Sequence, residues 1–397
     1  MEKKSYTLQS IVLYFLKLGY MGFGGPVALV GYMHRDLVEE KKWITEEEYK
    51  EGMALAQLSP GPLAAQLGIY LGFVDYGIWG ATLVGIAFVL PSFLMVLTIG
   101  IAYKIYGGLP WMQAVFYGVG ACVIGIICLS AYKLTIKSIS KLNAAAMQKN
   151  WLLWFFYFFA GIFTVISQSE PVSLFIAGGL LYMLIKAPPD FLKRNLMSWV
   201  FFLSAPAFIF LDHRERLLDI ALFFTKAGAF VFGSGLAIVP FLHGGVVNEF
   251  HWLNEKEFLD AVAVAMITPG PVVITVGFIG YLASGFVGAG VAALATFLPC
   301  YLLTVIPAPY FKKISKNTSI KAFVDGITAA VIGALAGAVI IIAVNTFTQN
   351  HSVVIDIPSV LIAIITVFAL LKVKKLTEPI LILIAAMLGL GLKLFLL

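Results

Sequence analysis

Two Pro-Gly-Pro motifs, at residues 60–62 and 269–271, interrupt long apolar segments of the chain. Proline removes a backbone donor and clashes with the preceding turn, so each motif is expected to end one helix and begin another. The first amides of the new helix, those of Leu63 and Ala64 in the first copy, would then lack carbonyl partners. The helix dipole would add about half a positive charge there, which favours an anion-binding site. The alternative is that these residues only permit kinks or close helix packing.

A second pair of motifs precedes the first pair: Phe23-Gly24-Gly25-Pro26 and Phe232-Gly233-Ser234-Gly235. They can break the first apolar element of each half in the same way. Four neutral side chains that flank the first Pro-Gly-Pro could bind oxyanion oxygens: Gln57, Ser59, Gln66 and Tyr70. Their counterparts in the second half are Met266, Thr268, Thr275 and Ile279, of which Thr268 is also a candidate. Their patterns differ between the halves, so a single asymmetric site is favoured over two equal ones.

Two matched pairs of ionisable residues are further candidates, because an ionisable group in hydrocarbon is a functional candidate by default. Lys17 and Lys226 lie ahead of the first-element breaks, where each could offset a divalent anion or extend to the membrane interface. His34 and His243 follow those breaks. They could take part in proton-linked transport, since histidine titrates near neutrality, or make hydrogen bonds at an interface.

The composition specifies the class of protein that must position these residues. Of 397 residues, 60% are apolar and 12% are charged, and the mean hydropathy is +0.95. This excludes an ordinary soluble enzyme, and the apolar runs are too long for barrel strands, so we expect an all-α polytopic membrane protein. A net charge of +6 fits basic loops against anionic lipid rather than nucleic acid. Three cysteines without ligand spacing support neither disulfides nor a metal, and we expect no cofactor.

The chain contains an internal repeat. Residues 15–68 align without a gap with residues 224–277, at an offset of 209, with 19 identities in 54 positions. The match continues at an offset of 208, as at Pro91 and Pro299. We therefore predict a first repeat at residues 1–187, a linker at 188–215 that could hold a crossing or interfacial segment, and a second repeat at 216–397. In each second element, Thr45 and Asn254 stand three residues before a glutamate, as in a capping box.

The distribution of lysines indicates that the repeats are inverted. The loop after the fourth apolar element is lysine-rich in the first half and lacks lysine in the second, and the bias reverses in the loops after the third and fifth elements. For the repeats to be inverted, one half and the linker together must cross the membrane an odd number of times. Either residues 196–211 supply a crossing, or one of the first two elements of each half is re-entrant; the sequence leaves both open.

The motifs together resemble the chromate ion transporter family in its long, two-domain form. The resemblance is carried by FGGP, a charged segment with a Trp, and QLSPGPLAAQLGIYLGF, and by their companions FGSG and TPGPVVITVGFIGY. It covers essentially the whole chain. It implies export of chromate, a relation to sulfate handling, and a site drawn from Phe23, Gly24, Gly25, Pro26, Gln57, Pro60, Gly61, Pro62, Gln66, Phe232, Gly233, Ser234, Gly235, Pro269, Gly270 and Pro271. The sequence departs from the family pattern in having Ser59 before the first Pro-Gly-Pro, and His34 as the nearest histidine after GGP.

The leading hypothesis is a secondary transporter, not an enzyme, that exports chromate or a related divalent oxyanion across the inner membrane. A proton gradient or anion exchange would drive it, and one half would rock against the other. The alternatives are a transporter of sulfate or another anion with chromate incidental, and a membrane-embedded enzyme, for which no hydrolase or nucleotide motif is present. The expected partners are the anion and the lipid bilayer; the sequence leaves open whether two copies form a homodimer.

Overall fold

The computed structural model describes residues 6–23, 25–140, 144–168, 172–189, 216–230, 235, 238–311, 317–348, 355–373 and 376–396. Within these ranges the regular structure is helical and contains no strand, which confirms the predicted all-α class. The first half contains α1 (Leu8–Met21), α2 (Gly25–Met33), the π-helix η1 (His34–Glu40), α3 (Glu46–Leu58), α4 (Leu63–Tyr106), α5 (Pro110–Ser138), α6 (Ala144–Lys149), α7 (Trp151–Ser167) and α8 (Val172–Lys186).

The second half repeats this order. It contains α9 (Arg216–Ala229), α10 (Ile238–His243), the π-helix η4 (Gly244–Glu249), α11 (Glu255–Ile267), the 3₁₀ turn η5 (Val272–Ile274), α12 (Thr275–Val305), the 3₁₀ turn η6 (Ala308–Tyr310), α14 (Thr318–Phe347), α15 (Ile357–Lys372) and α16 (Glu378–Leu396). The proposed linker crossing at residues 196–211 lies outside the described residues.

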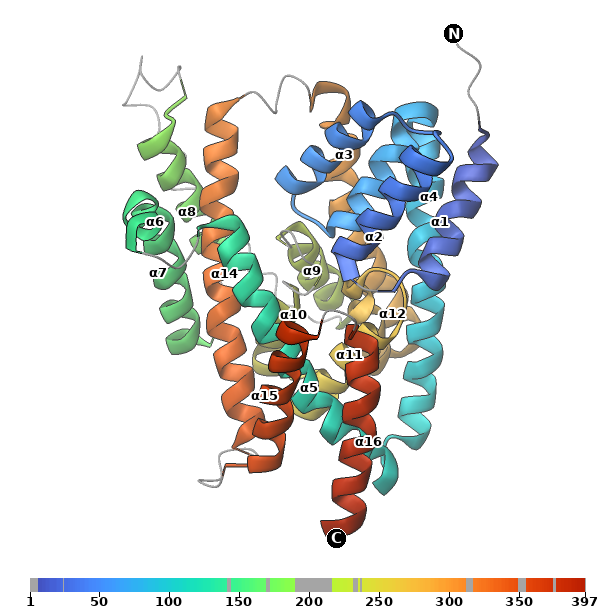
Figure 1. The fold of residues 1–397 in the computed structure, drawn as a ribbon, viewed down its shortest axis with the longest axis vertical. Helices are drawn as coiled ribbons and strands as arrows, with labels where there is room; N and C mark the ends of the chain where they lie inside the picture. Colours follow the sequence, from blue (N-terminus) through green and yellow to red (C-terminus); the bar gives the residue numbers. More distant parts are fainter. Residues whose placement is uncertain are drawn as a thin grey trace.

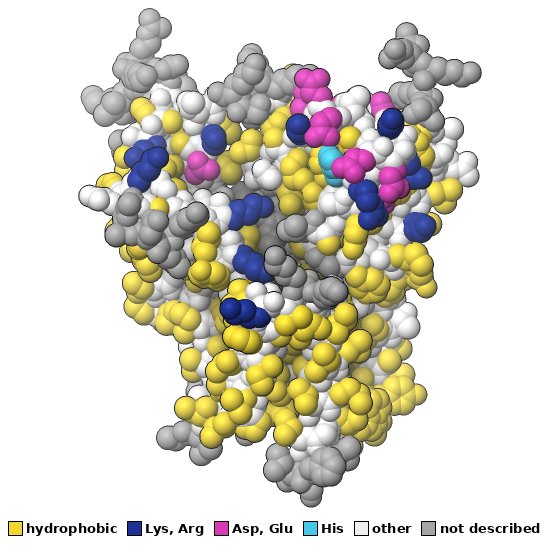
Figure 2. Space-filling view, in the orientation of Figure 1, with side chains coloured by type: hydrophobic (Ala, Val, Ile, Leu, Met, Phe, Trp, Pro, Cys, Tyr) yellow, Lys and Arg dark blue, Asp and Glu magenta, His cyan; other side chains and the backbone are white. Residues whose placement is uncertain are grey.

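Several helices are suited to a bilayer. Four described segments are long and apolar enough to cross one: Leu63–Tyr106, Pro110–Ser138, Val272–Tyr310 and Thr318–Phe347. Five shorter apolar helices accompany them. Figure 2 shows hydrophobic side chains over the lower part of one face, while charged side chains gather toward its upper part. The predicted polytopic membrane fold is confirmed at this level.

The starts of α3 and α11 follow the predicted capping boxes. Thr45 accepts a hydrogen bond from the amide of Glu48, whose carboxylate accepts one from the amide of Thr45 in return. Asn254 and Glu257 make the same pair of bonds at the start of α11. Each box satisfies two amides that helix geometry leaves without partners, so both helices begin at equivalent positions.

The first element of the first half folds back on itself between α1 and α2. The Tyr6 ring stacks on the Trp43 ring at a centroid distance of 5.0 Å, and the Tyr14 hydroxyl donates to Asp36 Oδ2 at 3.2 Å. These contacts join the beginning of α1 to the chain that follows α2. The turn between the two helices, at the FGGP motif, is therefore the tip of a helical hairpin. In the second half, Phe223 of α9 packs edge to face against Trp252, at a centroid distance of 5.7 Å.

The second element folds back too. α3 ends at Leu58 and α4 begins at Leu63, and a Cβ placed on Gly52 of α3 would lie 2.4 Å from the Tyr70 ring of α4. The Pro-Gly-Pro motif is thus the tip of a second hairpin. The re-entrant alternative requires one such element in each half. In the first half both elements fold back, which leaves four of its six apolar elements, an even number.

α4 is not one straight helix. At Gly77 the backbone takes φ +59°, a conformation that favours glycine, and the chain reverses there. The backbones of Gly72 and Gly80 consequently touch, since a Cβ on Gly80 would lie 2.0 Å from the Gly72 carbonyl oxygen. Gly285 makes the equivalent reversal in α12, with φ +66°.

The two halves are interleaved rather than side by side. α5 of the first half packs against α15 and α16 of the second, and α14 packs against α7 and α8 of the first (Figure 1). We call α5, α7, α8, α14, α15 and α16 the helix unit. The hairpin unit contains α1–α4 and α9–α12, with α4 packed against α12. The units meet mainly where α11 packs against α5 and α16, and where α10 packs against α14.

Glycines permit the close packing of the helix unit. A Cβ on Gly118 of α5 would lie 2.0 Å from the carbonyl oxygen of Ala385 in α16, and one on Gly333 of α14 would lie 2.1 Å from that of Tyr157 in α7. Close backbone approach at small residues is how membrane helices gain packing energy without a hydrophobic driving force. Each half therefore supplies surfaces that only the other half covers.

Candidate functional site

The first Pro-Gly-Pro break is tightly enclosed. Gly61 has φ +140°, and a Cβ there would lie 2.7 Å from Gln66 Nε2 and 3.0 Å from Cys300 Sγ. Gln66 Nε2 donates to the carbonyl oxygen of Pro60 at 2.7 Å. The Gln66 side chain is fully buried, and its Oε1 has no hydrogen-bond partner in the described structure. The break is therefore held in shape by a residue of the helix that follows it.

The second break contacts the first half. The amide of Gly270 donates to the carbonyl oxygen of Gly22 at 2.9 Å, which ties the second Pro-Gly-Pro to the tip of the first hairpin. Gly270 has φ +94°, and a Cβ there would lie 2.0 Å from Ser92 Oγ. The Ser92 hydroxyl donates to the carbonyl oxygen of Gly19 at 3.2 Å.

The two breaks are enclosed reciprocally. Cys300, which faces Gly61, and Ser92, which faces Gly270, occupy equivalent positions in the repeat and directly follow the in-helix prolines of α12 and α4. Each half therefore covers the Pro-Gly-Pro glycine of the other. The predicted break residues lie at the crossing of α4 and α12.

The helices that begin after the two breaks have backbone amides that can act as hydrogen-bond donors. No backbone carbonyl of the described residues accepts from the amides of Leu63 and Ala64, while the Gln66 amide bonds to the Pro62 carbonyl. In the second half the chain begins with the 3₁₀ turn η5, in which the Ile274 amide bonds to the Pro271 carbonyl. The residues at both starts are buried. Both are thus enclosed N-termini with unsatisfied donors, which suit an anion.

The second break is flanked by both first-element tips. A Cβ on Gly235, of the FGSG motif, would lie 3.4 Å from the Val273 side chain and 3.6 Å from its amide nitrogen, and Gly22 bonds to Gly270. The structure therefore brings together the predicted Gly235, Thr268, Pro269, Gly270 and Pro271 with the first tip. The predicted residues Gly24, Phe232, Gly233 and Ser234 lie outside the described residues.

The remainder of the first tip lies near an acid. Gly25 has φ +72°, and a Cβ there would lie 3.7 Å from Glu378 Oε2 of α16. Phe23 is 43% exposed. Gly25 therefore faces the helix unit, with a carboxylate beside the start of α2.

The polar residues that flank the two breaks differ in how deeply they are buried. Gln57 is exposed, so it points away from the break, whereas Gln66 is fully buried beside it. Thr268 is buried and its hydroxyl donates to the Ala265 carbonyl at 3.1 Å. Tyr70 donates to Glu51 at 3.3 Å and is already engaged. Of the neutral donors predicted from the sequence, Gln66 and Thr268 therefore lie at the breaks.

Lys17 links two hollows on the surface. One, of about 850 Å³, is mostly apolar and also includes Thr268 and Pro269 of the second break; the other, of about 630 Å³, includes Arg35 and Lys41. Lys17 has no carboxylate partner among the described residues. Lys226, its counterpart on α9, is exposed and lines neither hollow. The lysine pair is therefore unequal, and only Lys17 lies on a surface that reaches a break.

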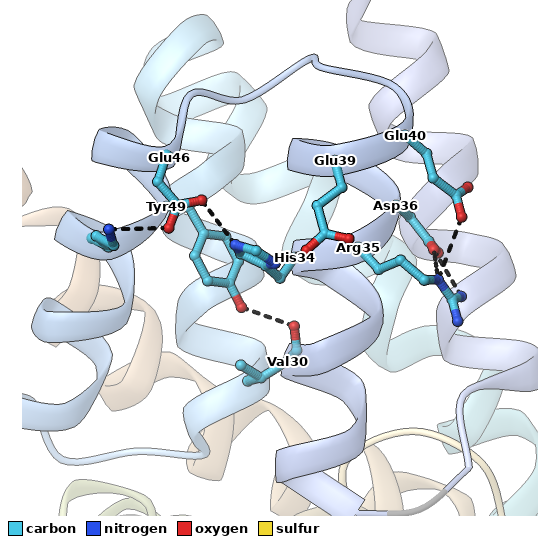
Figure 3. Close-up of polar contacts among 9 residues, drawn as sticks. Val30, His34, Arg35, Asp36, Glu39, Glu40, Glu46 and Tyr49 are labelled. Carbon is cyan, nitrogen blue, oxygen red and sulfur yellow. Dashed lines mark hydrogen bonds and ion pairs between the residues drawn. The ribbon is translucent and has the colours of Figure 1, made fainter.

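The matched histidines fasten the hairpins to one another. His34 Nε2 bonds to Glu46 Oε2 at 2.8 Å, and its Nδ1 lies 3.0 Å from Glu39 Oε1 (Figure 3). Hydrogen bonds from His34 and Lys50 hold the pKa of the exposed Glu46 below its ordinary value. His243 makes the equivalent bond to Glu255 at 2.7 Å and is only 1% exposed. Both histidines thus join a first hairpin to the start of the second, away from the breaks.

Sequence reasoning missed several residues that complete this site. Ser92, Cys300 and Gly22 contact the break glycines, and Glu378 faces Gly25. Ser92 and Cys300 could have been found from the repeat alignment, because they follow the paired prolines. No group of three or more His, Cys, Asp or Glu residues in the described part of the chain could hold a metal ion.

Comparisons with known proteins agree on one family. The family model described as "Chromate transporter" matches residues 9–183 and again residues 218–390, so the two halves are homologous repeats. The chain is 61% identical over 390 residues to a "Chromate transport protein" of Cupriavidus metallidurans, covering 97% of this chain and 93% of that protein. It is 57% identical to a "Probable chromate transport protein" of Synechococcus elongatus, covering 97% and 95%.

A shorter relative matches one repeat. The "Uncharacterized transporter YwrB" of Bacillus subtilis is 24% identical over 184 residues, which cover 46% of this chain and 91% of that protein. No solved structure matches the chain.

Proposed function

Because this chain belongs to the chromate transporter family, we propose that it is a secondary transporter that exports chromate across the inner membrane. The proposal rests mainly on one observation: the second Pro-Gly-Pro lies against the tips of both first elements. Gly270 of the second Pro-Gly-Pro bonds to Gly22 of the first tip, and Gly235 of the second tip approaches Val273.

The chemistry of this place suits a tetrahedral dianion. Chromate carries two negative charges over four oxygens and needs several donors when it leaves water. The main-chain amides after Pro271 could supply some of these donors without a fixed cation, and the helix dipole adds positive potential. Lys17 would attract the anion along the hollow that includes Thr268 and Pro269. The buried first break, held by Gln66, would complete the asymmetric site.

We propose that the repeats are inverted, with the breaks near the middle of the membrane. The reversed lysine bias between equivalent loops supports this, as do the start of α1 and the end of α16, which lie at opposite ends of the molecule in Figure 1. The first two elements of each half would be re-entrant hairpins, and the linker at residues 188–215 would supply the crossing that makes the number odd.

Rocking of one half against the other, expected from the sequence, does not suit this packing. α14 is held by α7 and α8, and α5 by α15 and α16, so the halves cannot separate without breaking those contacts. Instead, the hairpin unit would move against the helix unit and carry the breaks from one side to the other.

A related function is transport of sulfate or another divalent tetrahedral anion, with chromate incidental. Main-chain amides recognise charge and shape, and sulfate shares both with chromate. A proton gradient or exchange of anions would supply the energy for either cargo.

Flux measurements test the proposal directly. The purified protein in lipid vesicles should move labelled chromate under an imposed pH gradient or against a trapped anion, and competition by sulfate would rank the two cargoes. If neither anion moves under any gradient, the proposed function is wrong.

A further inference from the structure

Asp260 is a deeply buried carboxylate outside the breaks. It lies on α11 with 2% of its surface exposed, and its Oδ2 accepts a hydrogen bond from the Tyr103 hydroxyl at 2.7 Å. Tyr103 lies in the last turn of α4, so this bond joins the two halves of the chain. Among the described residues, no lysine, arginine or histidine forms an ion pair with Asp260.

The charged form of Asp260 is therefore poorly compensated. A carboxylate that is buried without a cation is unfavourable, and binding a proton removes the uncompensated charge. The other groups that act on Asp260 are Lys256 and Glu257, both nearer the start of α11. Its chain neighbour Leu259 belongs to the large buried apolar cluster, and a Cβ on Gly120 of α5 would lie 3.8 Å from the Leu259 side chain.

The Asp260–Tyr103 bond lies where the two units meet. The Tyr103 ring packs against Phe116 of α5, in the helix unit, and Phe278 of α12, in the hairpin unit, each at 5.4 Å. Movement of one unit against the other would shift Phe116 relative to this bond. The access of water to Asp260 would then change with the same movement that carries the breaks.

The repeat places a second acid at the equivalent position. Glu51 corresponds to Asp260 at the offset of 209, and it accepts a hydrogen bond from Tyr70 of α4 at 3.3 Å. Each half thus pairs a carboxylate with a tyrosine of α4, although Tyr70 and Tyr103 occupy different positions in the repeat. Glu51 is only partly buried, so Asp260 is the deeply buried member of this pair.

We propose that Asp260 is the group that carries the proton when chromate movement is coupled to a proton gradient. This rests on the proposed function. In one arrangement of the units, Asp260 takes up a proton and donates it in a hydrogen bond to the Tyr103 oxygen. In the other arrangement it releases the proton to water and again accepts from the Tyr103 hydroxyl. One O–H bond forms and the same bond breaks in each cycle, with no change in oxidation state.

The test separates coupling from transport. The full-length wild type and the variant Asp260→Asn are reconstituted in vesicles that contain a pH-sensitive dye. Two fluxes of labelled chromate are measured: flux driven by a pH gradient, and exchange against trapped unlabelled chromate at equal pH. We expect D260N to lose the gradient-driven flux and the dye signal and to keep the exchange, which should no longer vary with pH.

The matched control is Glu51→Gln, which should keep both fluxes and the dye signal. Gradient-driven flux in D260N equal to that of the wild type would overturn the assignment. So would loss of both fluxes in D260N, because a structural role predicts this. Asp260→Glu, which keeps a proton-binding group, should restore gradient-driven flux with an altered pH profile, and failure to do so while exchange persists would also count against it.

The wild type alone distinguishes the two proposals. If it moves chromate in neither assay, the proposed function fails. If it exchanges chromate but never responds to a pH gradient, transport stands and the role of Asp260 is wrong.

Discussion

The amide of Gly270 lies 2.9 Å from the carbonyl oxygen of Gly22, so a break in the second repeat is closed by a turn in the first. This bond fixes the position of the second Pro-Gly-Pro relative to α1. It also leaves the next amides, after Pro271, available to a ligand. A substitution that moves Gly270 should therefore affect binding before it affects the rest of the fold.

Gly270→Val is expected to abolish chromate flux. The φ of +94° is strained for valine, by about 1–3 kcal/mol, and the new Cβ would collide with Ser92 Oγ. Flux into vesicles and elution as a monodisperse species would be measured together. Gly290→Val on α12 is the control, since a Cβ there meets nothing within 4 Å. Normal flux in G270V would remove this break from the site.

Gln66→Leu should impair transport and lower the melting temperature. Leucine cannot donate to the Pro60 carbonyl, and an unsatisfied buried acceptor costs about 1–3 kcal/mol. The matched control is Gln57→Leu, nine positions earlier, whose side chain is exposed. Thermal unfolding in detergent and vesicle flux should separate the two variants; equal behaviour would show that burial at the break does not matter.

The hydrogen bond between His34 and Glu46 should contribute less to stability at acidic pH. The pKa of Glu46 is lowered in the folded state because His34 and Lys50 donate to its carboxylate. Its contribution to stability is thus fully present above the ordinary glutamate pKa of about 4.3, and it is lost as the pH falls through the lowered folded value. The difference in melting temperature between the wild type and Glu46→Gln should therefore shrink as the pH falls. Glu47→Gln, an exposed neighbour, should show no such trend.

Glu378→Gln is expected to tighten chromate binding. The carboxylate faces Gly25 at the start of α2, where a negative charge opposes an incoming dianion. Removal of one partly screened charge should change the affinity by about threefold to tenfold, or about 1 kcal/mol. Isothermal titration with chromate would measure this, with Glu249→Gln as an exposed control. Weaker binding in E378Q would mean that the carboxylate supports the tip rather than opposing the anion.

Local features of this structure could be read from the sequence, because each depends on neighbouring residues. The capping boxes at Thr45 and Asn254 start helices as predicted, and the all-α class follows from the apolar composition. The repeat is confirmed by the double match to one family model. The predicted donors Gln57 and Gln66 could not be ranked, because their burial depends on how α3 and α4 fold back.

Contacts between distant segments could not be predicted from the sequence. The enclosure of Gly61 by Cys300 and of Gly270 by Ser92 depends on the crossing of α4 and α12, which no local pattern specifies. Interleaving of the halves likewise follows from close backbone contacts such as that of Gly118 with Ala385. A periodic sequence shows which face of a helix is apolar but not which partner covers it.

Interleaving has a consequence for biogenesis. α5 is synthesised long before α15 and α16, and it must wait in the bilayer with its glycine-lined surface uncovered until they arrive. Residues 1–187 and 216–397 produced as two polypeptides should accordingly be degraded when expressed singly and accumulate only when expressed together.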